Sequence, residues 1–288
     1  MAASLEVVSR LAREHLTPPV AEKWISLLRP AARLKHAGPG EAIVGELGGD
    51  PWLHEDVDWP VWGGHGPLTH VGSVDCQALK GITLDLALPG DGRLAFFYFD
   101  GQLDGGQAIV FYEQPDSLAG SRVLYVPAGA NATRRRTPKG LTPYPRVALT
   151  AEPIVTYPGF DHPALRRAFE AETLEPRAFL DHPVNADAFT DALSELDAGP
   201  FHQVGGYADP IQGPIEYEVA QAALGGKVDW RDPALEREAS QWSLLAQIDT
   251  DDDANMMWGD AGMLYWAIRP ADLDKHRLDA ASFTWQCS

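Results

Sequence analysis

The chain has 288 residues, and its 41 acidic residues outnumber its 23 lysines and arginines, which gives a formal net charge of −18. This charge repels the phosphate backbones of nucleic acids, so we expect no nucleic-acid ligand. Hydrophobic residues make up 45% of the chain, enough for a folded interior. No stretch approaches the roughly 18 consecutive apolar residues of a membrane span, so we expect no membrane insertion either.

The cysteines and the N-terminal residues indicate the cellular compartment of the protein. Cys76 and Cys287 are the two cysteines, and in an acidic chain of this size they favour reduced thiols over a disulfide framework. Residues 1–13 contain Glu6, Arg10 and Arg13 and no apolar run of signal-peptide length. These features predict a cytoplasmic protein.

Two short helices are predicted at the start of the chain. Ser4 is a suitable N-cap for an amphipathic helix over 4–15, and a second helix over 19–28 ends at Pro30. Antiparallel strands follow, separated by turns rich in Gly and Pro. Their apolar or aromatic runs predict strands over 68–74, 93–99, 108–112, 122–126 and 147–157.

The middle of the chain is predicted to be helical and the end returns to strands. Asp161, with Pro163 in the first turn that follows, and Asp232, directly before Pro233, are suitable helix N-caps. The apolar spacing predicts further helices over 186–196 and 215–224, with Gly225-Gly226 ending the second. Strands are expected over 242–249, 262–268 and 282–287. A helical turn is expected between the second and third of these strands.

Three sequence features recur in the same order in both halves of the chain. Each half has a Gly-Gly turn, then a strand ending in Asp, then a glycine followed by an aromatic strand. The pattern predicts an α+β fold dominated by antiparallel sheet, with two related halves at about 45–126 and 200–288 and pseudo-two-fold symmetry. We expect helices at the N-terminus and between the halves. The domain organisation predicted is an N-terminal helical arm over 1–40 and one domain over 41–288.

Several motifs together resemble one known family. They include Gly48-Gly49-x-Pro51, Gly205-Gly206-Tyr207, Met257-Trp258-Gly259-Asp260 and the terminal Gln286-Cys287. From about residue 40 to the C-terminus the chain resembles the YwqG-like family, a bacterial family of unknown function. The resemblance implies an α+β domain and carries no established activity or catalytic residues. The strand at His70 departs from the family pattern, which usually has a glutamine there, and this weakens a symmetric two-site interpretation.

An acidic stretch offers a candidate cation site. Asp249, Asp251, Asp253, Asn255 and Asp260 occupy positions 1, 3, 5, 7 and 12 of a twelve-residue window. Alternate oxygen ligands at this spacing are typical of calcium loops. Ala254 replaces the glycine that the sharp turn of an EF-hand needs, and strands rather than helices flank the window. A charged hairpin between strands remains the alternative.

Polar residues next to apolar strands and turns are candidate binding residues. They are Gln212, Gln247, Trp258, Asp260 and Gln286. A tryptophan can stack on a ligand, and an amide on a buried face needs hydrogen-bond partners that a pocket would supply. Each also has a structural alternative: Trp258 in the core, Asp260 bonded to turn amides, and Gln247 bonded to a loop.

Two functions are compatible with these features. The first is a non-enzymatic protein whose acidic surface binds a protein partner, with an antitoxin or immunity role as one version. The second is a divalent-metal-dependent enzyme or binding module that uses Asp249, Asp251, Asp253 and Asp260. No cofactor is expected in the first, and a divalent cation is the candidate cofactor in the second. The absence of a nucleophile elbow, a phosphate loop or a zinc spacing motif favours the first.

Overall fold

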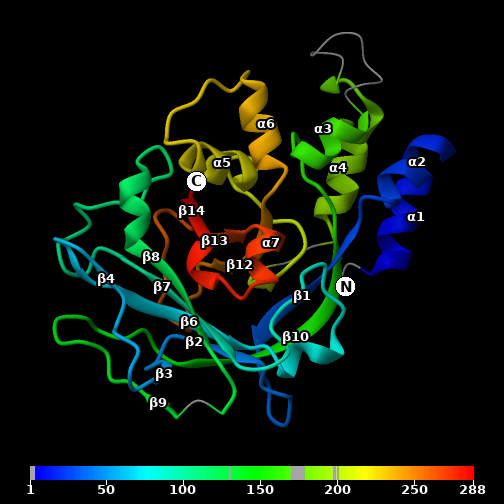
Figure 1. Cartoon of the computed structure of the whole chain (residues 1–288). Coiled ribbons are helices and arrows are strands. Elements are labelled where there is room, and N and C mark those ends of the chain that lie inside the picture. Colours follow the sequence, from blue (N-terminus) through cyan, green and yellow to red (C-terminus); the bar gives the residue numbers. More distant parts are fainter. Residues whose placement is uncertain (1–3, 130, 170–178, 197–198, 200) are drawn as a thin grey trace.

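The computed structural model describes residues 4–129, 131–169, 179–196, 199 and 201–288 (Figure 1). The α-helices are α1 (Leu5–His15), α2 (Pro18–Ile25), α3 (Pro163–Phe169), α4 (Asp187–Ser194), α5 (Ile215–Ala223), α6 (Pro233–Ala239) and α7 (Pro270–Leu273). The large sheet contains β1 (Arg29–His36), β2 (Gly45–Leu47), β6 (Thr69–Asp75), β7 (Arg93–Tyr98), β8 (Ser121–Val126), β10 (Val147–Thr156), β11 (Gln203–Val204), β12 (Ser243–Asp249), β13 (Met263–Ile268) and β14 (Ser282–Gln286). Two small sheets pair β3 (Trp52–His54) with β9 (Ala132–Arg134) and β4 (Val61–Trp62) with β5 (Gly66–Pro67).

The large sheet has ten strands in the order β14-β13-β12-β11-β1-β10-β2-β6-β7-β8, and its pairs are antiparallel. The long pair β1–β10 lies at the centre, with four strands in mirrored order on either side. A register shift interrupts β6–β7 between His70 and Gly72, and another interrupts β12–β13 between Leu244 and Ala246. The mainly antiparallel α+β class is therefore confirmed, whereas a sequence repeat between the halves stays a prediction.

The sheet curves until its outer strands face each other, so that it is nearly barrel-shaped. Phe96 of β7 lies 5.0 Å from Trp266 of β13, measured between ring centroids, although six strands separate β7 from β13 in the sheet order. The Trp266 indole also donates a 2.9 Å hydrogen bond to Ser121 of β8. One large hydrophobic core fills the inside of this curve and draws residues from both ends of the sheet.

Six of the described α-helices pack in two groups, of which the second lies on the outer face of the sheet. The first comprises α1 to α4, which share an apolar core that includes Trp24, Phe169 and Phe189. The second, α5 and α6, packs on the outer face of β12 and β13 through Ile215, Leu235 and neighbouring residues (Figure 1). The Ser4 side chain accepts a hydrogen bond from the Val7 amide, which confirms the predicted N-cap.

Two local predictions differ from the structure. Residues 29–36, predicted from the sequence to belong to a helical arm, form the central strand β1. Its sequence Arg-Pro-Ala-Ala-Arg-Leu-Lys-His has no β-branched residue, so pairing with β10 over eight positions determines its conformation. Residues 108–112 are not a strand: Val110 packs into the large core, and the chain turns at Phe111–Gln114.

Candidate functional site

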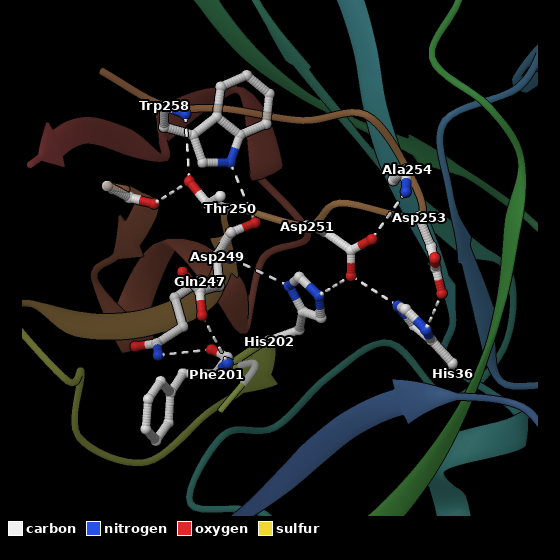
Figure 2. Close-up of polar contacts among 11 residues, drawn as sticks. His36, Phe201, His202, Gln247, Asp249, Thr250, Asp251, Asp253, Ala254 and Trp258 are labelled. Atoms are coloured by element: carbon white, nitrogen blue, oxygen red, sulfur yellow. Dashed lines mark hydrogen bonds and ion pairs between the residues drawn. The ribbon is translucent and has the colours of Figure 1, made fainter. Parts of the chain in front are cut away.

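A cluster of histidines and aspartates links β1, β11 and β12, three neighbouring strands, at the edge where β1 and β12 end and β11 begins. His36 ends β1, His202 precedes β11, and Asp251 follows β12 (Figure 2). Within the described chain, these three residues form the group whose ligand atoms all lie within 4.8 Å of one another. His202 is fully buried and Asp251 is 4% exposed, whereas His36 lies at the surface. The cluster therefore reaches from the surface into the core.

The hydrogen bonds of His202 determine which ring nitrogen carries its proton. The backbone amide of Asp249 donates to Nδ1 at 3.0 Å, so Nδ1 acts as an acceptor. The proton of the neutral ring then lies on Nε2, which donates to Asp251 at 3.0 Å. A metal-binding histidine instead offers the lone pair of one ring nitrogen to the ion, while the N–H on the other nitrogen donates to an acceptor. As arranged, His202 positions Asp251 and does not present a lone pair to a cation.

His36 lies between two carboxylates. Its Nε2 is 2.6 Å from Asp251 and its Nδ1 is 3.1 Å from Asp253 (Figure 2). Both ring nitrogens therefore face acceptors, an arrangement that the doubly protonated imidazolium satisfies. Burial alone would raise the pKa of Asp251, but hydrogen bonds from His202, the Ala254 amide and His36 outweigh it and hold that pKa well below its usual range. The geometry is that of an ion-pair network between β1 and the β12–β13 connection.

The predicted metal ligands are separated in the structure. Asp251 and Asp253 both contact His36, but the Asp249 carboxylate turns away and accepts a 3.0 Å hydrogen bond from the Phe201 amide. Asn255 is exposed in a turn with a positive φ of 52°. Asp260 is also exposed, and its carbonyl accepts a hydrogen bond from the Ser288 amide. Among described residues, Asp249, Asp253 and Asp260 form no close ligand group with Asp251.

Two of the predicted binding glutamines hold one loop in place. Gln247 is fully buried, accepts from the Asp209 amide and donates to the Phe201 carbonyl. Gln286, 1% exposed, accepts from the amides of Ile211 and Gln212. The Gln286 amide nitrogen donates to the Gly213 carbonyl and to Glu218. Together they fasten segment 209–213 to β12 and β14.

The other predicted binding residues differ in position. Trp258 is buried, and its indole donates to the Asp249 carbonyl at 3.2 Å while its ring packs edge-on against Tyr98 and Tyr144. Gln212 donates to the Cys287 carbonyl and lies on the wall of a large pocket. This pocket is a second candidate site, separate from the histidine cluster.

The pocket has a volume of about 1010 Å³ and lies between α5, α6 and residues 160–167, the last five of which belong to α3. Its aromatic wall comprises Tyr112, Phe160, Tyr217 and Trp230. Phe160 and Trp230 are 57% and 60% exposed, which is unusual for such large apolar side chains. Trp230 meets Tyr217 edge-on with ring centroids 6.0 Å apart. These rings make an apolar cleft of a size that accommodates a small organic molecule.

Glu218 contributes a buried carboxyl group to this pocket. It lies on α5, is 8% exposed and accepts hydrogen bonds from Thr284 at 2.5 Å and Gln286 at 3.0 Å. Burial raises the pKa of Glu218 to about 7, although the two hydrogen bonds act to lower it. In the described part of the chain, no lysine, arginine or histidine forms an ion pair with Glu218. A carboxyl group of this kind is typical of ligand-binding and proton-transfer sites.

Neither Glu218 nor Trp230 was identified from the sequence as a site residue. One signal was present, because Glu216 and Glu218 interrupt the apolar residues Ile215, Tyr217 and Val219 in the predicted helix 215–224. In an amphipathic helix such acids usually mark the solvent face. Here both faces of α5 are covered, one by β13 and β14 and the other by α6, so the acids are buried.

The chain belongs to a family of proteins defined by a domain of unknown function, DUF1963, whose sequence profile matches residues 45–287. The matched region includes both candidate sites except for His36. No curated protein matches the chain. None of the helices in the described part of the chain is long and apolar enough to cross a membrane.

Proposed function

We propose that this protein binds a small organic molecule in the pocket between α5, α6 and residues 160–167. The observation that carries this proposal is the combination of an open 1010 Å³ pocket, four aromatic wall residues and one buried carboxyl group. Ligand sites of proteins have this composition, in which apolar walls provide affinity and a few polar groups fix orientation.

The exposed aromatic residues support the same conclusion. Phe160 and Trp230 leave more than half of their surface in contact with water, which costs free energy unless a binding partner covers them. Both lie on the pocket wall, so a ligand in the pocket would cover them. Fully burying one aromatic side chain stabilises a complex by about 2 kcal/mol.

The histidine cluster supports a structural role better than a metal-dependent one. His202 donates to Asp251 instead of offering a lone pair, and His36 is held between Asp251 and Asp253. These contacts join β1 to the β12–β13 connection. A protein partner for the acidic surface remains a proposal that rests on the net charge of −18 alone.

Ligand-observed NMR with a library of small metabolites tests the pocket. We expect wild-type protein to bind a subset of compounds, and Trp230→Ala to weaken that binding at least tenfold. Val61→Ala is the matched control, because Val61 is 57% exposed, belongs to β4 of a small sheet and does not line the pocket. Binding that is unchanged in Trp230→Ala, or a library from which nothing binds, would contradict the proposed function.

A further inference from the structure

In the described part of the chain, two of the four acids that line the pocket pair with arginines, one caps a helix, and Glu218 does neither. Arg166 forms an ion pair with Asp161, and Arg167 lies 3.7 Å from Glu236, which also accepts a 2.5 Å hydrogen bond from Tyr217. A further acid, Asp232, caps α6 by accepting from the Ala234 amide. The lining thus holds four acids and three arginines, the third being Arg231.

Glu218 is the acid that remains for a ligand, and it has room to accept more hydrogen bonds. Each of its oxygens accepts one, from Thr284 or from Gln286, and each carboxylate oxygen can accept two. Arg231 lies at the exposed surface and makes no side-chain hydrogen bond or ion pair with the described part of the chain. The buried carboxyl group of the pocket therefore has no cationic partner among the described residues, and Arg231, the arginine of the lining that is not paired, is exposed.

The aromatic wall complements a cation as well. Tyr112, Tyr217 and Trp230 line the same pocket as Glu218, and Trp230 packs edge-on against Tyr217. Faces of such rings attract ammonium groups, and an acidic protein of charge −18 raises the local concentration of cations. Aromatic rings around a carboxylate are the usual elements of sites for organic cations.

We propose that the ligand of this pocket is an organic amine, a molecule with a protonated amino group that Glu218 binds and an apolar or aromatic body that Phe160 and Trp230 cover. The inference rests on the proposed function and names its ligand class. The ammonium group donates to the free lone pairs of Glu218, and Thr284 and Gln286 hold that carboxylate in position.

Isothermal titration calorimetry with paired probes tests the ligand class. The probes are phenethylamine, tryptamine and a linear aliphatic diamine, each compared with its isosteric alcohol, and phenylpropanoate as an anion. At pH 8, where Glu218 is ionised, we expect at least one amine to bind at least tenfold more tightly than its alcohol. Glu218→Gln should remove this preference, because the amide is neutral and nearly isosteric.

Glu55→Gln is the matched control, because Glu55 is exposed and the substitution makes the same change in net charge. Alcohols or phenylpropanoate that bind as tightly as the amines would overturn the ligand class and leave the pocket as a binding site. An amine preference that survives in Glu218→Gln would overturn the ligand class in the same way. A complete lack of binding by all probes would also overturn it, and the metabolite library then decides separately whether the pocket binds other compounds.

Discussion

Among the buried acids that the structure describes, Glu218 differs from the others in having no cationic partner. Glu46 is bonded to Arg134 and Arg146, and Glu216 is paired with His162 at 3.2 Å. Burial tends to raise the pKa of both acids, but these partners outweigh it and lower their pKa values. For Glu218 burial prevails, since its partners are a neutral hydroxyl and a neutral amide. Such a group costs stability when it is ionised, a cost usually tolerated for function.

Glu218→Gln is predicted to reduce the pH dependence of stability. The pKa rises from 4.5 in the unfolded chain to about 7 in the folded protein, so the folded state binds more protons between these values. The free energy of unfolding therefore falls as the pH rises from 4.5 to 7, by roughly 3 kcal/mol from this group. Urea unfolding at pH 5 and pH 8 measures the difference. If the free energy of unfolding falls equally in wild type and variant between pH 5 and pH 8, Glu218 is not the group that causes the pH dependence.

Asp251→Asn is predicted to destabilise the protein by about 2 kcal/mol at pH 7. Asp251 accepts hydrogen bonds from His36, His202 and the Ala254 amide, and the amide group of Asn would face these donors with a donor of its own. Because the pKa of Asp251 is lowered in the folded state, its stabilisation is present above pH 3.8 and is lost on further acidification. The difference between wild type and variant in urea unfolding should therefore shrink as the pH falls below 3.8.

Asp252→Asn is the control for this prediction, since Asp252 is the adjacent residue and is exposed. Its free energy of unfolding should change by less than about 0.5 kcal/mol. Equal effects of the two substitutions would indicate that the contacts of Asp251 with the histidines contribute nothing to stability.

At the scale of elements, segment 205–213 connects the sheet to the pocket. It begins with Gly205 and Gly206, whose positive φ angles of 72° and 73° confirm the turn expected from the Gly-Gly pair. Gln203, Gln247 and Gln286 then bond its backbone at six positions. The segment ends at Gly213 and leads into Pro214, and both residues line the pocket directly before α5.

Gln286→Leu is predicted to loosen this segment and to destabilise the fold by about 2 kcal/mol or more, because the amides of Ile211 and Gln212 lose their acceptor. Hydrogen exchange of these two amides should accelerate strongly. Gln77→Leu, at an exposed glutamine, provides the control. Unchanged exchange at Ile211 and Gln212 would show that other contacts hold the segment.

The elements were largely predictable from the sequence, and the exceptions have a physical cause. Strands such as 93–98 and 263–268 are apolar and aromatic along most of their length, so local pattern identifies them. Strand β1 contains Pro30 and a run of alanine and arginine, and its conformation comes from pairing with β10, more than a hundred residues later.

The candidate sites were less predictable, because they depend on contacts between distant residues. His36 and Asp251 are 215 residues apart, and nothing in either local sequence indicates that they meet. The spacing of the aspartates at 249–260 predicts a calcium loop only if all of them face one point, and the structure directs Asp249 to a backbone amide and Asp253 to His36. Glu218 and Trp230 line the same pocket only because α5 and α6 pack together.

At the scale of the whole molecule, curvature of the sheet joins both halves into one core. Trp266→Phe removes the hydrogen bond to Ser121 and leaves a cavity between β13 and β8. We predict a loss of about 1–3 kcal/mol in the free energy of unfolding. Trp230→Phe, at an exposed tryptophan, is the matched control and should cost less than about 0.5 kcal/mol.

The shared core also predicts that the halves unfold together, so urea unfolding followed by tryptophan fluorescence and by circular dichroism should give coincident transitions. Two separate transitions in the wild type, or a Trp266→Phe effect no larger than that of Trp230→Phe, would show that the halves are independent of each other.

The central claim is that ligands bind between α5, α6 and residues 160–167, and the indole NMR signals test it most directly. The chain has nine tryptophans, and the signal of Trp230 is the one absent from Trp230→Phe. Titration with the tightest-binding amine should shift the Trp230 signal more than any other. An amine that binds and leaves the Trp230 signal in place, while that of Trp258 or another distant tryptophan moves, would contradict the claim.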